Sequence, residues 1–128
     1  MPSDPHTESN HRGIVVFAHG SRVEAANEAV RRVAADLARA ADYPHVEAAF
    51  LELGQPDLAG AVARLLEKGV GDVVVIPYFL TLGIHMERDL PKLVADICGE
   101  HPGITMRVTA PLDGHPAIAG ILLDRARE

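Results

Sequence analysis

The sequence predicts a single α/β domain in three layers, in which a four-stranded parallel β-sheet lies between helices on both faces. Two observations lead to this prediction. Short apolar runs rich in β-branched residues alternate four times with longer segments whose apolar residues recur at helical spacing. The chain has 128 residues, of which 48% are hydrophobic, and this suits one packed core. Parallel strands need connections that cross a face of the sheet, so helices are expected on both faces.

The first third of the chain contains two predicted strands and the helix between them. The run GIVVFA at Gly13–Ala18 is typical of a strand buried on both faces. A helix is predicted from Ser21 to about Ala41, because Ser21 and Glu24 have the S-x-x-E spacing of a capping box. Alternating apolar residues predict a second strand that ends near Leu51. The apolar stripe of the helix is Ala26, Val30, Val33 and Leu37.

The middle of the chain predicts a second helix and a third strand. Pro56 is expected to open this helix and Gly69 to close it. The strand is the run DVVVIP at Asp72–Pro77, and a longer loop at Tyr78–Arg88 follows it. A third helix is expected from about Asp89. The buried stripe of the second helix is Leu58, Val62, Leu65 and Leu66.

The last part of the chain predicts a fourth strand and a fourth helix. Ile104, Met106 and Val108 alternate as in a strand, and Pro116 begins the final helix. The apolar residues of that helix are Ile118, Ile121, Leu122 and Ala126. Residues 1–12 contain no apolar segment, so we expect a flexible N-terminal tail followed by one domain at residues 13–128.

Composition excludes several classes of function. No apolar run approaches the roughly 20 residues that span a bilayer, and the N-terminus lacks the apolar segment of a signal peptide. The formal charge is −6 without a stripe of Lys or Arg, so nucleic acid is not an expected partner. The single cysteine, Cys98, cannot form an internal disulfide, which favours a reducing, cytoplasmic setting.

Polar residues follow every predicted strand. His19 follows the first strand, Glu52 the second and His85 the third, while Asp113 and His115 follow the fourth. The carboxyl ends of parallel strands meet at one edge of a sheet, and ligands bind beyond that edge. Two imidazoles and a carboxylate suit a divalent first-row metal, and each can accept a proton. The sequence therefore predicts a metal or acid–base site at this edge.

Simpler explanations exist for most of these residues. His19 could be a loop histidine bonded to backbone, Glu52 a solvated carboxylate, and His115 part of a helix cap. His85 has a stronger case, because it lies in the apolar stretch FLTLGIHM, where Gly83 would let the backbone turn tightly. No G-x-G-x-x-G or G-x-x-x-x-G-K-[ST] motif is present, so dinucleotides and nucleoside triphosphates lack their phosphate-binding loop.

Four stretches of the sequence resemble one family, the short CbiX/SirB-type sirohydrochlorin chelatases of the class II chelatase group. They are HGSR at His19–Arg22, FLELGQP at Phe50–Pro56, IPYFLTLGIHMERDLP at Ile76–Pro91 and HPGITMRVTAPLDGHP at His101–Pro116. The resemblance covers the chain from Gly13 onward and implies a flavodoxin- or chelatase-like sheet. Thr81 and Leu82 depart from the residues that relatives often carry, without affecting the histidines.

The resemblance implies insertion of a divalent metal, with cobalt first and iron or nickel as alternatives, into the tetrapyrrole sirohydrochlorin. It assigns metal handling and catalysis to His19 and His85, with Glu52 as a further ligand or base. No permanent cofactor is expected, since the metal is itself a substrate. No ATP is expected, since its phosphate-binding loop is missing. Residues in or beside the motifs are assigned to the macrocycle, namely Ser21, Arg22, Tyr78, Gly83 and Arg88. Long relatives contain two such units, so the resemblance also implies a homodimer.

Two other functions fit the same sequence. A non-catalytic carrier or storage module could use His19, His85 and Glu52 to bind metal tightly, with no tetrapyrrole involved. A flavodoxin-like binding domain without metal chemistry is the third alternative. The missing phosphate loop argues against a flavin, and the polar residues gathered at one edge argue against a plain scaffold.

Overall fold

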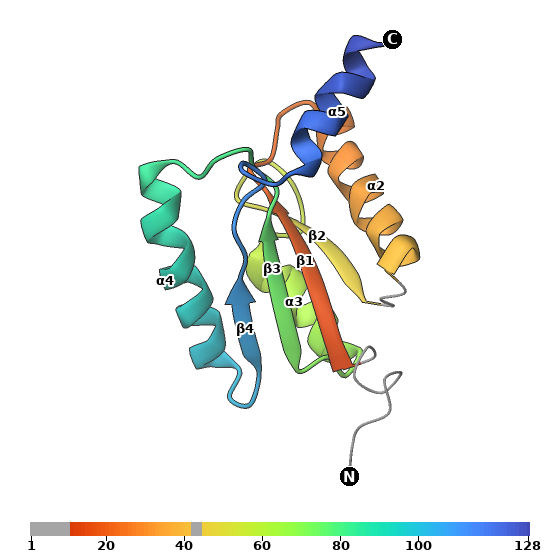
Figure 1. The fold of residues 1–128 in the computed structure, drawn as a ribbon. Helices are drawn as coiled ribbons and strands as arrows, with labels where there is room; N and C mark the ends of the chain where they lie inside the picture. Colours follow the sequence, from red (N-terminus) through yellow and green to blue (C-terminus); the bar gives the residue numbers. More distant parts are fainter. Residues whose placement is uncertain (1–10, 42–44) are drawn as a thin grey trace.

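The computed structural model describes residues 11–41 and 45–128 of the chain. Its four strands form one parallel sheet in the order β2-β1-β3-β4, as Figure 1 shows. The strands are β1 (Arg12–Ala18), β2 (Val46–Phe50), β3 (Asp72–Pro77) and β4 (Thr105–Val108). The helices are α2 (Glu24–Ala41), α3 (Leu58–Glu67), α4 (Ile84–Glu100) and α5 (Ala117–Ala126). The predicted α/β fold with a parallel four-stranded sheet is confirmed.

Helices cover both faces of the sheet and divide the core in two. Val15 and Phe17 of β1 point into the larger core, which α3 and α4 cover. Val16 and Ala18 point to the opposite face, where Ala34 of α2 packs against them. The central strand β1 is therefore buried on both faces, as its unbroken apolar run predicts.

The start of α2 differs from the prediction. The helix begins at Glu24, and the Ser21 hydroxyl accepts a hydrogen bond from the Val23 amide at 3.0 Å in the preceding turn. The expected capping box is therefore wrong. Ala26 is exposed, and the neighbouring Asn27 takes the buried position with only 1% of its surface accessible. A polar residue occupies the core-facing position because its amide has partners in two loops, described below.

The ends of α3 show one correction and one agreement. Pro56 precedes the helix instead of opening it, and Asp57 is the N-cap, whose carboxylate accepts from the Gly60 amide at 2.8 Å. At the other end, Gly69 has φ +85°, the left-handed conformation that commonly follows the last turn of a helix. Gly69 thus closes the helix as predicted.

The start of α4 is the largest difference from the sequence-based expectation. The helix begins at Ile84 instead of Asp89, so His85 lies in the first helical turn and not in a long loop. Pro91 lies inside this helix, where proline has no amide to donate to the preceding turn. Gly83 is the N-cap with φ −69°, a conformation open to any residue, so the expected tight glycine turn is also wrong.

The final helix begins after Pro116 as predicted, yet none of its residues is buried. Within residues 11–41 and 45–128, no helix has both the length and the apolar character needed to cross a membrane.

At the amino end of the sheet, Asp72 joins three strands through side-chain hydrogen bonds. The Thr105 hydroxyl of β4 donates to its carboxylate at 2.8 Å, and the Arg12 guanidinium of β1 donates at 3.2 Å. These contacts, led by the Thr105 hydrogen bond, hold the pKa of Asp72 below its ordinary value of 3.8. The ionised form therefore stabilises the folded sheet.

We predict that Thr105→Val lowers the free energy of unfolding by about 1 kcal/mol at pH 7, because the Asp72 carboxylate loses a donor. The pKa of Asp72 is lower in the folded protein than in the unfolded chain. The ionised carboxylate therefore stabilises the fold at pH values above the pKa of the unfolded chain. This stabilisation is lost as the pH falls through the pKa of the folded protein. Denaturant unfolding of both proteins at several pH values measures this difference. If the difference in unfolding free energy between wild type and Thr105→Val stayed constant below pH ~3, it could not be assigned to the ionisation of Asp72.

Candidate metal site at the carboxyl edge

His19 and Glu52 meet directly beyond the ends of β1 and β2. The imidazole Nε2 of His19 lies 3.0 Å from Oε1 of Glu52. Backbone hydrogen bonds between the two chain segments continue past the strands and bring His19 and Glu52 together. The Leu51 amide donates to the Ala18 carbonyl at 2.9 Å, and the Glu52 amide donates to the His19 carbonyl at 3.1 Å. Two of the residues predicted for the carboxyl edge thus form one imidazole–carboxylate pair.

Gly20 permits the close approach of the two loops. It has φ +96°, and a Cβ at this position would lie 1.7 Å from the carbonyl oxygen of Glu52. Any other residue would displace the Glu52 backbone in addition to adopting a strained conformation. The glycine of the HGSR motif is therefore required by the neighbouring strand's loop.

Asn27 fixes these loops from beneath, and sequence reasoning missed it. Its Oδ1 accepts from the Ser21 amide at 2.8 Å, and its Nδ2 donates to the carbonyls of Ser21 and Leu53, each at 2.9 Å. A third contact joins Nδ2 to the Glu24 carboxylate at 3.4 Å. The only sequence signal was a polar residue among apolar ones on the inner side of a helix.

Glu24, next to this network, is ionised more readily than an ordinary glutamate. The Arg31 guanidinium donates to its carboxylate at 2.7 Å, and this bond, followed by the one from Asn27, lowers the pKa of Glu24. Arg31 also donates to Glu28 and to the Gln55 carbonyl. Its hydrogen bond to Glu24, followed by the one to Glu28, raises the pKa of Arg31. Arg31 thus ties α2 to the loop that follows Glu52.

His85 lies apart from the His19–Glu52 pair, on the exposed first turn of α4. Its Nδ1 is 3.2 Å from the Arg88 guanidinium, which can only donate, so Nδ1 is the acceptor in this arrangement. A neutral His85 then carries its proton on Nε2. In the part of the chain that the structure describes, no three His, Cys, Asp or Glu side chains gather closely enough to hold a metal ion.

The other predicted residues have different surroundings. The Ser21 hydroxyl is engaged in the turn before α2, and Arg22 is exposed beside it. Tyr78 follows β3 at the same edge with a partly exposed side chain. The Nδ1 of His115 accepts from the Ala117 amide at 3.0 Å, which matches the capping role weighed for it.

Large apolar side chains are exposed in the two loops that carry the pair and in the neighbouring loop after β3, and this feature was not predicted. The loops after β1, β2 and β3, together with the first residue of α4, expose six of them. They are Val23, Leu51, Leu53, Tyr78, Leu80 and Ile84, which we call the apolar rim. Exposed apolar groups concentrated at one edge indicate a binding surface, because monomeric proteins rarely leave such patches uncovered. The signal was present in the sequence as apolar residues within loops.

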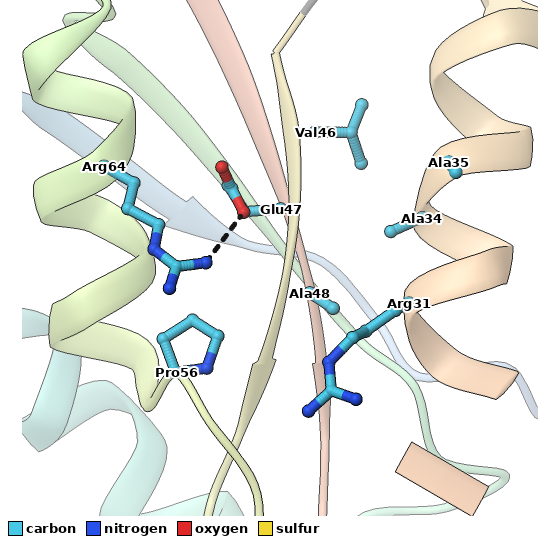
Figure 2. A pocket seen from close by; sticks show the side chains of 8 residues that line it. All are labelled: Arg31, Ala34, Ala35, Val46, Glu47, Ala48, Pro56 and Arg64. Carbon is cyan, nitrogen blue, oxygen red and sulfur yellow. Dashed lines mark ion pairs between the residues drawn. The ribbon is translucent and has the colours of Figure 1, made fainter. Parts of the chain in front are cut away.

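Two hollows of about 190 Å³ each open near β2. One lies beside Leu51 at the carboxyl edge and is lined by Phe17, Phe50 and Leu93 among others. The other, in Figure 2, lies along the outer side of β2, where Arg64 pairs with Glu47 at 3.7 Å and Arg31 is held by its own partners. The first hollow extends the apolar rim, while the charges of the second are already paired.

The fold and the edge together define a parallel α/β protein with an exposed imidazole–carboxylate pair and an apolar rim at the same edge of the sheet. The model of the CbiX family matches residues 13–128. A chloroplastic sirohydrochlorin ferrochelatase of Arabidopsis thaliana is 35% identical over 88% of this chain and 50% of its own length. A sirohydrochlorin cobaltochelatase of Methanopyrus kandleri is 30% identical over 90% of this chain and 94% of its own. The chain belongs to the CbiX family.

Solved structures agree with this assignment. A CbiX protein from Marinobacter aquaeolei VT8 superposes with a TM-score of 0.79 at 28% identity, covering 91% of this chain and 94% of that protein. The cobalt complex of the sirohydrochlorin chelatase SirB from Bacillus subtilis subspecies spizizenii has a TM-score of 0.82 at 22% identity, which shows the shared fold. The chain spans half of SirB and half of the Arabidopsis relative.

We predict that Gly20→Ala lowers the free energy of unfolding by about 2 kcal/mol or more, because the new methyl group collides with the Glu52 carbonyl. Gly99→Ala in α4 is the matched control, since nothing lies within 4 Å of its added Cβ, and it should gain about 0.5–1 kcal/mol. Denaturant unfolding measures both. Equal stability of Gly20→Ala and wild type would contradict the close approach of the two loops.

Proposed function

We propose that this protein is a sirohydrochlorin chelatase that inserts a divalent metal into the tetrapyrrole. The observation that carries the proposal is the His19–Glu52 pair at the same edge as the apolar rim. A tetrapyrrole is a large, nearly flat ring with an apolar face and carboxylate substituents. A rim of apolar side chains suits the ring, and an imidazole beside a carboxylate suits the metal and the ring protons.

The spacing of the pair fits one metal ion. Ligand atoms at about 2.1 Å from an ion and 3.0 Å from each other subtend about 90°, the angle between neighbouring ligands in octahedral geometry. The proton now shared by His19 Nε2 and Glu52 Oε1 would leave when the ion enters. Both side chains are 58% exposed, which suits an ion that arrives hydrated and departs in the product.

Insertion also requires two pyrrole N–H protons to leave the ring. Glu52 can accept a proton once the metal passes from the pair to the ring, and the imidazole of His19 can accept another. His85 enters this scheme only when Arg88 releases its Nδ1. A carboxylate substituent of the macrocycle is the natural partner to draw Arg88 away, so ring binding would free an imidazole for metal or proton.

Local positive charge offsets the net charge of −6 at this edge. Arg22 and Arg88 are exposed there, and α2, α3 and α4 begin at the same edge with their N-termini. Helix N-termini attract carboxylates through free N–H groups and the helix dipole. These groups are suited to the carboxylates of the macrocycle, while Tyr78 is suited to stack on its ring.

The high exposure of the pair also weighs against the alternative of a metal carrier or store. Such a protein needs an enclosed set of ligands that retains the ion. We propose cobalt as the first metal, with iron and nickel as alternatives, no requirement for ATP, and a dimer as the working form. The names of the curated relatives, which include both a cobaltochelatase and a ferrochelatase, support the reaction class.

We predict that wild-type protein accelerates the insertion of Co²⁺ into sirohydrochlorin over many turnovers. His19→Ala should lower the rate constant roughly 100-fold or more, because it removes a metal ligand and a proton acceptor. His85→Ala should also be slow. An anaerobic absorbance time course without ATP measures each rate, and Fe²⁺ and Ni²⁺ in the same assay rank the metals.

The matched control is His101→Ala, which removes an imidazole at the C-cap of α4, far along the helix from His85, and should retain the wild-type rate. Insertion by His19→Ala at the wild-type rate would remove His19 from the mechanism. Tight binding of Co²⁺ by the wild type without any acceleration of insertion would favour the carrier over the chelatase.

A further inference from the structure

The loop between β2 and α3, residues 51–55, is closed at its base and tied to α2. The Phe50 amide donates to the Pro56 carbonyl at 2.9 Å, which joins the two ends of the loop. Arg31 of α2 donates to the Gln55 carbonyl at 3.0 Å, and its guanidinium lies 5.2 Å from the centroid of the Phe50 ring. Figure 2 shows this arginine reaching from α2 toward β2. The loop is therefore held in one shape by contacts at both of its ends.

Leu53, in the middle of this loop, has a backbone conformation that leucine seldom adopts. Its φ is +59°, and it is the one non-glycine residue with positive φ in the part of the chain that the structure describes. A left-handed conformation brings the Cβ close to the following carbonyl oxygen, so it costs free energy in leucine and not in glycine. The Asn27 amide donates to the Leu53 carbonyl at 2.9 Å, and this hydrogen bond helps to hold the conformation.

The next residue, Gly54, is a glycine for a different reason. A Cβ there would lie 2.8 Å from Cγ of Phe50 and 3.2 Å from Nδ2 of Asn27. Gly54 does not have a positive φ, so it provides space and not a turn. The loop thus contains a glycine where its neighbours are close, and a leucine where a glycine would relieve the strain.

The fold does not account for a leucine at position 53. Its side chain is 52% exposed and packs in neither of the two cores formed by the described residues. A single exposed leucine is ordinary, but an exposed leucine in a strained conformation is not. Such conformations are concentrated at ligand-binding sites, where the surrounding structure maintains them. The apolar surface of Leu53 is therefore suited to contact a bound molecule.

The neighbours of Leu53 indicate which molecule this is. Leu53 directly follows Glu52, whose Oε1 lies 3.0 Å from Nε2 of His19, and Glu52 and Leu53 are both more than half exposed. In the proposed reaction the metal passes from this pair to the ring nitrogens, so the ring must come to lie against the pair. A flat apolar ring in that place is beside the exposed leucine.

We propose that Leu53 binds the apolar face of the tetrapyrrole and places it against the His19–Glu52 pair. This inference rests on the proposed function and divides the loop between the two substrates, with Glu52 for the metal and Leu53 for the macrocycle. The strained backbone keeps the leucine outside the core of the free protein. The contact surface is therefore present before the ring binds, which lowers the entropic cost of binding.

Leu53→Gly separates this role from a structural one. Glycine adopts the left-handed conformation without strain, so the variant should unfold at the same urea concentration as wild type or at a higher one. The Kd for metal-free sirohydrochlorin, measured by titration of its absorbance, should rise roughly tenfold or more because the apolar contact is lost. In anaerobic insertion assays the KM for the macrocycle should rise in parallel, while the KM for Co²⁺ stays unchanged.

Leu53→Met is the matched control, because it keeps an apolar side chain of similar volume and should bind the ring as wild type does. An equal Kd for the ring in wild type and Leu53→Gly would overturn the contact and leave the proposed function intact. A lower urea midpoint, a raised KM for Co²⁺ or a lower mass of Leu53→Gly in light scattering would also overturn it, since the leucine would then support the loop or a protein interface. A wild type that binds no sirohydrochlorin would instead overturn the proposed function, and this contact with it.

Discussion

The buried amide of Asn27 holds the site together, because it bonds to both of the loops that present His19 and Glu52. Its carbonyl oxygen and its two N–H groups are all used, on Ser21 in one loop and on Leu53 in the other. The loops can approach this closely only because residue 20 has no side chain. A polar group buried in this way is costly unless every bond is made, so the network specifies one loop geometry.

The buried Asn27 network supports the exposed side chains of His19 and Glu52. His19 and Glu52 are open to water, while the groups that position them are buried, so the site is preorganised without being closed. A metal that must arrive, lose its water and leave in a product requires that combination. The apolar rim then explains how a large ring could exclude water from the pair on binding. In the proposed function, His85 takes part after Arg88 releases its Nδ1.

The fold could be read from the sequence because its strands are short unbroken apolar runs and its helices carry apolar stripes. The edge position of His19 and Glu52 followed from the same alternation, since parallel strands share one carboxyl edge. Three features could not be read. Asn27 contributes through bonds to distant loops, α4 begins at Ile84 although it was expected from about Asp89, and α5 is apolar although none of its residues is buried. The role of Asn27 depends on contacts between segments, which local patterns do not encode.

The position of the bound metal tests the central claim most directly, namely that the junction of β1 and β2 handles the ion. Anomalous diffraction at the cobalt edge from crystals soaked in Co²⁺ locates it. The account predicts a cobalt ion between Nε2 of His19 and Oε1 of Glu52, with the direct hydrogen bond between them replaced. Cobalt found only at other histidines, with the His19–Glu52 hydrogen bond intact, would contradict it.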